Sequence, residues 1–227
     1  MQKEVPTLVS VVVDIDDTLV DTRKRMQAIL EHVLGRSVPL EDVGALNLRQ
    51  IFEKHASEEQ KARASELQRR FFGLLLCEDE TGVELARLDE TIPFAAEALR
   101  KWGERCTIVY LTGRPETTRD LTTATLEGFG LPTEGVEMAM VTIKDWRGGR
   151  VNEARKALLT SISERHDVVR VVDDFPGYFT IYQELEIPDR IGLRLSDKYE
   201  PEDFIEKGAT RVVESWEQLI DDVPGMN

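Results

Sequence analysis

Residues 8–22 read LVSVVVDIDDTLVDT, an apolar segment that runs directly into a group of acidic residues. Short runs rich in valine are typical of the buried strands of a parallel sheet. Ligands of such sheets bind beyond the carboxyl ends of the strands, where Asp14, Asp16 and Asp17 follow the apolar run. Folding does not require several carboxylates at one strand end, whereas Mg²⁺ prefers oxygen ligands and shares them with phosphate groups. The segment therefore predicts a metal-dependent site at this strand end.

Composition narrows the class of protein. The 227 residues suffice for one large domain, or for a core with a small second domain. A formal net charge of −14 argues against broad contact with nucleic acid or anionic membrane, because both require a basic surface. The early apolar run makes a poor signal peptide, and no stretch reaches transmembrane length. Cys77 and Cys106 are too few for a disulfide framework, so we expect a cytoplasmic protein without a membrane partner.

The order of helix and strand patterns predicts the fold class. Residues 23–87 carry helical periodicity and no strand pattern, with a capping box at Ser57 and Gln60. After Thr91, strand patterns alternate with helix-length connections; we expect strands at residues 107–111, 136–143, 168–172, 191–195 and 209–213. This alternation predicts an α/β fold, a Rossmann-like parallel sheet flanked by helices. Residues 1–22 and 88–227 would form this core, and residues 23–87 a small helical insert after the first strand.

Polar residues follow two further predicted strands. Thr112, Gly113 and Arg114 come after one, and Asp173 and Asp174 come after another. A parallel sheet places such strand ends side by side, next to the acids of the first strand. With these motifs in this order, the chain resembles the haloacid dehalogenase-like hydrolases, a superfamily made up mostly of Mg²⁺-dependent phosphatases. The resemblance implies that the helical insert is a cap of the type which that family places between its first two motifs.

The resemblance also implies roles for the residues at the strand ends. Asp14 would be the nucleophile that forms an aspartyl-phosphate, and Asp16 the general acid and base. Thr112 would hydrogen-bond the phosphate, with Gly113 and Arg114 beside it as further substrate-binding residues. The metal ligands implied for Mg²⁺ are the side chains of Asp14, Asp173 and Asp174 and the backbone carbonyl of Asp16.

The family also carries a lysine at or before the helix that precedes the last acidic strand. In this chain that helix reads NEARKALL over residues 152–159, and Lys156 is the predicted catalytic lysine. Lys144 is the second choice. Arg155 would serve only if this protein departs from the usual lysine.

The predicted function is a Mg²⁺-dependent phosphatase that hydrolyses a small phosphorylated metabolite through an aspartyl-phosphate. Three alternatives stay open: a polynucleotide end-processing phosphatase, a phosphomutase, and a non-catalytic protein with the same fold. The first is considered because the Thr-Gly-Arg-Pro run at residues 112–115 resembles a strand end of nucleic-acid repair enzymes. The net charge disfavours the first, and the intact Asp14 and Asp16 disfavour the last. The sequence predicts neither the substrate nor the oligomeric state.

Overall fold

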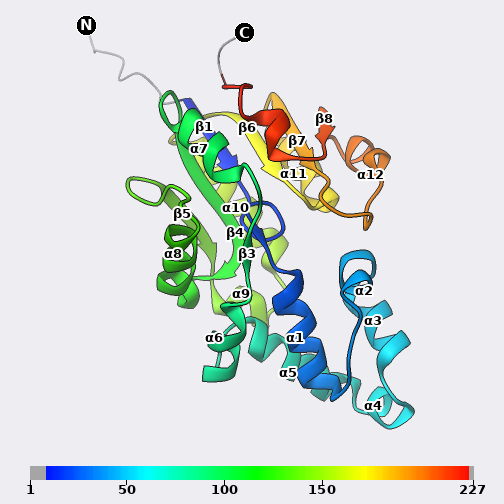
Figure 1. Cartoon of the computed structure of the whole chain (residues 1–227). Coiled ribbons are helices and arrows are strands. Elements are labelled where there is room, and N and C mark those ends of the chain that lie inside the picture. Colours follow the sequence, from blue (N-terminus) through cyan, green and yellow to red (C-terminus); the bar gives the residue numbers. More distant parts are fainter. Residues whose placement is uncertain (1–8, 225–227) are drawn as a thin grey trace, which may run out of the picture. The chain divides into compact units, whose positions relative to one another are not determined.

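The computed structural model describes residues 9–224 and divides the chain into two compact units (Figure 1). The larger unit comprises residues up to Leu19, Thr91–Leu195 and residues from Tyr199 onward. The smaller unit comprises Val20–Glu90 together with Ser196–Lys198. None of the helices in the described part of the chain has the length and apolar character needed to cross a membrane.

A six-stranded sheet forms the centre of the larger unit, and each neighbouring pair of strands is parallel. Across the sheet the order is β5 (Glu137–Val141), β4 (Thr107–Pro115), β1 (Val9–Val13), β6 (Asp167–Asp173), β7 (Asp189–Leu193) and β8 (Arg211–Val213). The strand order reverses at β1, which lies between β4 and β6. Sheets of this kind bind ligands where the order reverses, beyond the carboxyl ends of the strands. The predicted α/β fold with a Rossmann-like parallel sheet is confirmed.

Helices cover the sheet on both faces (Figure 1). The helices of this unit are α7 (Ala95–Gly103), α8 (Arg119–Gly128), α9 (Ile143–Arg147), α10 (Val151–Ser163), α11 (Phe179–Glu184) and α12 (Pro201–Glu206), and the short 3₁₀ turns are η1 (Glu116–Thr118), η2 (Pro176–Tyr178) and η3 (Trp216–Leu219). Residues of α10, α11 and α12 pack in one apolar cluster with Val12 and Val171 of the central strands. On α7, Trp102 is fully buried and contacts Trp216 of η3.

The smaller unit is helical, as the sequence predicts for residues 23–87. It contains α1 (Arg23–Leu34), α2 (Leu40–Ala45), α3 (Leu48–His55), α4 (Glu58–Ala62), α5 (Ala64–Leu75) and α6 (Glu80–Ala86). Its own core includes Ile29, Leu30, Phe52 and Phe71. Two short strands, β2 (Val20–Asp21) and β3 (Glu90–Thr91), pair with each other where the chain enters and leaves this unit. The role of the unit as a cap stays a prediction.

Several element boundaries differ from those expected. The predicted capping box of Ser57 and Gln60 forms, but the helix it begins ends at Ala62, and α5 follows after a break at Arg63. Pro115, a residue type that suits the first turn of a helix, instead ends β4. Phe94, which matches the apolar spacing of Ala98, Leu99 and Trp102, lies before α7 with φ of 66° and is 44% exposed. The short helices α6, α9 and α12 lack the long periodic pattern on which sequence prediction depends.

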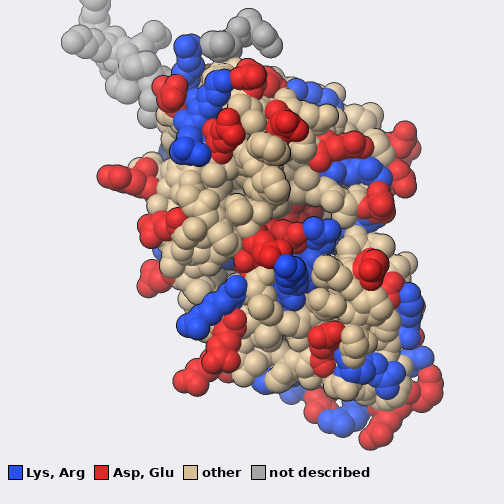
Figure 2. Space-filling view, in the orientation of Figure 1, with Lys and Arg blue, Asp and Glu red and all other residues tan. Residues whose placement is uncertain are grey.

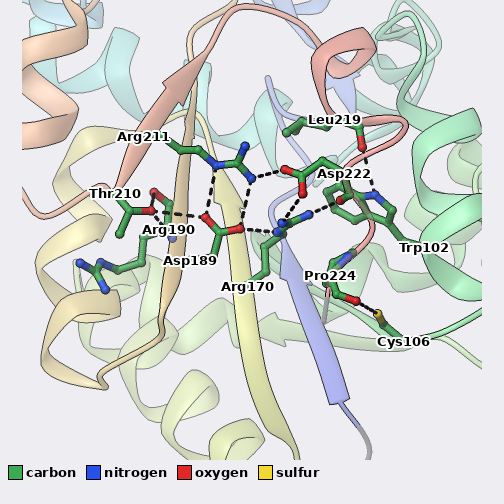
Figure 3. A network of polar contacts seen from close by, with 10 residues as sticks. All are labelled: Trp102, Cys106, Arg170, Asp189, Arg190, Thr210, Arg211, Leu219, Asp222 and Pro224. Carbon is green, nitrogen blue, oxygen red and sulfur yellow. Dashed lines mark hydrogen bonds and ion pairs between the residues drawn. The ribbon is translucent and has the colours of Figure 1, made fainter. Parts of the chain in front are cut away.

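Charged residues of β6, β7 and β8 form a network with Asp222 (Figure 3). Asp189 and Arg211 are the first residues of their strands, so the network lies away from the carboxyl ends, where the acidic residues are. Arg170 of β6, which is buried, donates to Asp189 of β7 at 2.6 Å and to Asp222 at 2.9 Å. Arg211 of β8 donates to the same two carboxylates. Two guanidinium groups and two carboxylates balance in charge, and they fasten the segment after η3 to three strands.

This network predicts a stability effect at Asp222. Burial alone would raise the pKa of Asp222, but hydrogen bonds from Arg211 and Arg170 outweigh it, and the pKa is lowered. A lowered pKa in the folded state stabilises the protein above the ordinary Asp pKa of about 3.9, and that contribution is lost as the pH falls further. We expect Asp222→Asn to lower Tm at pH 7 by about 4 °C, the equivalent of about 1.5 kcal/mol. The difference from wild type should shrink below about pH 4.

The adjacent Asp221 offers a matched control. Its side chain is 90% exposed and pairs with Lys101 at the surface, so Asp221→Asn should leave Tm nearly unchanged. Thermal unfolding of both variants over a pH series is the measurement. An equal Tm loss in the two variants would contradict the structural role assigned to Asp222.

Candidate active site

Asp14 lies at the centre of the acidic sheet edge. It directly follows β1, whose last residue Val13 is in register with Tyr110 of β4 and Val172 of β6. The Asp14 backbone N–H donates to the carbonyl of Val172 at 3.0 Å, which extends the strand pairing by one residue. Asp14 is only 6% exposed. Because β1 lies between the longer strands β4 and β6, the Asp14 carboxylate is located at the point where the strand order reverses.

Asp173, the last residue of β6, and Asp174, which follows it, lie beside Asp14 there. Carboxylate oxygens of Asp14, Asp173 and Asp174 lie within 4.8 Å of one another. Asp174 also accepts a hydrogen bond from the hydroxyl of Thr18 at 3.4 Å. Three hard oxygen donors at this spacing fit a small divalent cation such as Mg²⁺. The structure therefore brings together the three side chains that the family resemblance implies as metal ligands.

Arg155 is the basic residue at the centre of this group. Its Nη1 donates to Oδ1 of Asp14 at 2.6 Å, and its Nη2 donates to Oδ2 of Asp173 at 2.8 Å. The guanidinium carbon also lies 4.0 Å from the centre of the Tyr178 ring. Arg155 is 3% exposed, and its Nε has no hydrogen-bond partner among residues 9–224. A buried guanidinium thus joins the nucleophile candidate to the metal-ligand candidates.

Hydrogen bonds also occupy both oxygens of Asp173. Its Oδ1 accepts from the backbone N–H of Phe175 at 2.8 Å, and its Oδ2 accepts from the hydroxyl of Tyr182 at 2.6 Å as well as from Arg155. Burial, reinforced by the Asp173 carboxylate, raises the pKa of Tyr182 well above its ordinary value. The phenol therefore stays protonated and remains a donor to Asp173.

The charge balance of the site favours a bound cation. Burial raises the pKa of Asp14 well above its ordinary value; the Arg155 guanidinium opposes this, and Asp173 adds to it. Burial likewise raises the pKa of Asp173 against the opposing effect of Arg155. With all three carboxylates ionised, the single guanidinium leaves a net formal charge of −2. A divalent cation would neutralise that charge and keep all three carboxylates ionised.

Asp16 is held by Arg114. The Nε of Arg114 donates to both carboxylate oxygens of Asp16, at 3.1 and 3.0 Å, and Nη2 donates to Oδ1 at 2.7 Å. Arg114 is buried, whereas the Asp16 side chain is 33% exposed. The next residue, Asp17, has φ of 56°, a left-handed conformation that Asp tolerates better than most residues and that otherwise favours glycine.

The carboxyl end of β4 contributes backbone and hydroxyl groups. Thr112 is fully buried, and its Oγ1 accepts a hydrogen bond from the backbone N–H of Arg114 at 3.1 Å. The indole of Trp146 in α9 donates to the carbonyl of Gly113 at 2.5 Å. The strand was expected to end at residue 111, but β4 extends to Pro115, so Thr112, Gly113 and Arg114 belong to the strand itself and not to a loop after it. They still lie at the carboxyl end of the strand beside Asp14, and Arg114 reaches Asp16 from there.

The structure does not bring Lys156 into this site. Its Nζ donates to Glu184, and its side chain is 50% exposed. Lys144, the second choice, is exposed on α9. The basic residue found with Asp14 and Asp173 is Arg155, so the prediction of Lys156 places the wrong neighbour in this group. The missed signal is helical spacing: Arg155 lies four and seven residues before Leu159 and Ile162, the other buried residues of α10.

Comparisons with known proteins agree on the fold. No family model and no curated protein matches the chain. Among solved structures, a haloacid dehalogenase-like family hydrolase from Streptococcus pneumoniae is similar with 13% identity and a TM-score of 0.63, over 94% of this chain and 97% of that chain. A HAD family hydrolase from Deinococcus radiodurans R1, with bound phosphate and sodium, gives 18% identity and a TM-score of 0.58, over 94% of this chain and 93% of that chain.

A third similar structure is that of a predicted phosphatase from Clostridium acetobutylicum, with 16% identity and a TM-score of 0.62, over 95% of this chain and 98% of that chain. All three likenesses extend over nearly the full length of both chains. Identities this low carry information about the fold and not about the reaction. The chain has the fold of the haloacid dehalogenase-like hydrolases.

Proposed function

We propose that this protein is a Mg²⁺-dependent phosphatase that hydrolyses a small phosphomonoester through an aspartyl-phosphate on Asp14. The observation that carries this proposal is the group of three carboxylates around one buried guanidinium, with two negative charges left for a cation. The fold supports the proposal because it places this group at the point where the strand order reverses.

In the first step, a carboxylate oxygen of Asp14 attacks phosphorus as the bond from phosphorus to the ester oxygen breaks. Asp16 supplies the proton that the leaving alkoxide takes up. Both Asp16 oxygens accept hydrogen bonds from Arg114, so this donation requires Arg114 to release one of them. The products are the alcohol and the phosphorylated Asp14.

In the second step, a water molecule attacks the phosphorus of phosphorylated Asp14 and gives a proton to Asp16, and the bond to Asp14 breaks. Inorganic phosphate leaves and the Asp14 carboxylate is restored. Arg155 stays beside Asp14 throughout and offsets the charge on the transferred group. When bound, Mg²⁺ would supply further charge neutralisation and would be held by Asp14, Asp173, Asp174 and the carbonyl of Asp16.

The partner that fits this site is a small phosphorylated metabolite. Lys and Arg are interspersed with Asp and Glu on the visible face of the described residues, without a continuous basic surface (Figure 2). A polynucleotide substrate would favour a basic surface, and the net charge of −14 argues further against one. A cytoplasmic location stays a prediction.

Asp173 and Asp174 are expected to differ in their share of metal binding. Both oxygens of Asp173 accept hydrogen bonds from within the protein, and Asp173 is buried, whereas Asp174 is only partly buried; we therefore expect Asp174 to have the larger share of metal binding. We expect Asp174→Asn to weaken Mg²⁺ binding by roughly 100-fold or more, because even outer-shell partners account for about 10–100-fold. Asp173→Asn should instead lower Tm, because it disturbs Arg155 and Tyr182. Isothermal titration calorimetry and thermal unfolding measure the two effects, and equal losses of Mg²⁺ affinity would contradict the assignment.

The experiment that tests the function is a panel of phosphomonoesters assayed for released inorganic phosphate, with Mg²⁺ and with EDTA. The panel includes sugar phosphates, nucleotides, phosphorylated amino acids and a 3′-phosphorylated oligonucleotide. We expect Mg²⁺-dependent release from at least one small substrate. Release from the oligonucleotide alone, interconversion of sugar phosphates without release, or no turnover at all would each contradict the proposal.

A further inference from the structure

The hydroxyl of Tyr182 joins two groups of the candidate site. It donates to Oδ2 of Asp173 at 2.6 Å and accepts from Nη2 of Arg155 at 3.2 Å. Nη2 of Arg155 donates to that same Oδ2. Tyr182 is 2% exposed and packs edge-on against Phe179, at 5.4 Å between ring centres. A rigid, buried side chain therefore holds one side of the guanidinium fork.

The other terminal nitrogen of the guanidinium, Nη1, contacts Asp14, the candidate nucleophile. Nη1 of Arg155 reaches Asp14 only while Nη2 is held near Asp173 and Tyr182, because the guanidinium is planar and its nitrogens have a fixed spacing. The Tyr178 ring, 4.0 Å from the guanidinium carbon, restrains motion out of that plane. Tyr178 and Tyr182 are four residues apart in η2 and α11, so one short segment supplies both restraints.

We propose that Tyr182 is a positioning residue for catalysis, which acts by holding Arg155 in the orientation that serves Asp14. This inference rests on the proposed function. A lysine would need no such support, since its ammonium is a compact charge without a plane to orient. An arginine at this position needs a partner that fixes the orientation of the guanidinium group in its plane, and Tyr182 is that partner.

The first test compares Tyr182→Phe with Tyr110→Phe. Tyr110 is also fully buried and donates to the carbonyl of Pro132 at 2.7 Å, so each variant removes one tyrosine hydroxyl and the hydrogen bond that it donates; Tyr182→Phe also removes the acceptor of the bond from Arg155. We expect Tyr182→Phe to lower kcat about tenfold, or about 1.4 kcal/mol, with KM changed by less than about threefold. Tyr110→Phe should keep both constants within about twofold. An equal kcat loss in the two variants, or none in Tyr182→Phe, would overturn the proposal.

The second test asks whether Tyr182 acts through Arg155. In an Arg155→Lys background there is no fork to orient, so adding Tyr182→Phe should lower kcat by less than about threefold. A full tenfold loss in that background would show an effect that does not pass through Arg155, and would overturn the proposal.

The third test does not depend on activity. The side-chain N–H groups of Arg155, assigned in an NMR spectrum by their absence in Arg155→Lys, should exchange slowly with water in the wild type and in Tyr110→Phe. In Tyr182→Phe we expect that exchange to be at least about tenfold faster. Unchanged exchange would overturn the positioning role even where turnover falls. If the wild type hydrolyses no phosphomonoester, the proposed function fails, and this measurement still decides whether Tyr182 holds Arg155.

Discussion

Phosphate release is expected to fall by roughly four orders of magnitude or more when Asp14 is replaced by asparagine, a loss in the range known for covalent nucleophiles. Asparagine keeps the shape of the side chain and its contact with Arg155, but the amide cannot form the aspartyl-phosphate. The measurement is kcat on the best substrate of the panel, with saturating Mg²⁺. Turnover near that of the wild type would refute the covalent role of Asp14.

Two further observations separate this loss from a folding defect. Asp14→Asn reduces the net charge of the group around Arg155 from −2 to −1, so we expect Tm to stay level or to rise. Asp167 provides a matched control because it is exposed at the amino end of β6, the end of that strand remote from Asp173. Asp167→Asn should retain wild-type kcat. A marked drop in Tm for Asp14→Asn would mean that lost structure contributes to its lost activity.

The acidic part of the site could be predicted from the sequence because strand ends are easy to recognise. A buried apolar run has one end where the side chains become polar, and parallel strands bring those ends to one edge. Asp14 and Asp173 follow from this reasoning alone, and the register of β1 with β6 confirms their proximity. The sheet order follows less directly, because β1 is first in the chain and yet lies in the middle of the sheet.

The basic part of the site could not be found in the same way. The prediction of Lys156 rests on residue type, because the family that the chain resembles uses lysine. The buried position belongs instead to its neighbour, Arg155. Successive residues of a helix differ by about 100° in direction, so adjacent side chains cannot both face the sheet. Leu159 and Ile162 mark the buried face of α10, and Arg155 shares it. Weighing helical phase above residue type would have selected the arginine.

The contacts of Asp16 and Tyr182 were beyond sequence reasoning for a different reason. Arg114 was predicted to bind substrate, and nothing in its sequence position indicates a bidentate contact with Asp16. Tyr182 belongs to a short helix whose burial depends on how α11 packs against the sheet. Side-chain partners that are far apart in the chain, 98 residues in the case of Arg114 and Asp16, emerge only from the folded structure.

Replacing Arg155 is expected to have the second largest effect, and a comparison with Lys156 decides which of the two serves the site. Arg155→Met should lower kcat by roughly 10²–10³-fold, the loss seen when one group that stabilises transition-state charge is removed. It should also destabilise the protein by about 3–5 kcal/mol, or roughly 10 °C in Tm, because Asp14 and Asp173 lose their buried cation. Lys156→Met removes only a surface pair with Glu184 and should change kcat and Tm little.

Arg155→Lys keeps this comparison informative if Arg155→Met does not fold. It retains the buried positive charge but loses the fork that reaches Asp14 and Asp173 together, so we expect a kcat between those of the wild type and Arg155→Met, with Tm closer to the wild type. Measuring kcat, KM and Tm for all three variants distinguishes charge from geometry. If Lys156→Met lost activity while Arg155→Met retained it, the lysine chosen from the sequence would be the functional residue. The reverse result would establish that this chain uses an arginine where the resembling family uses lysine, since burial in the site, and not residue type, selects the cation that faces the nucleophile.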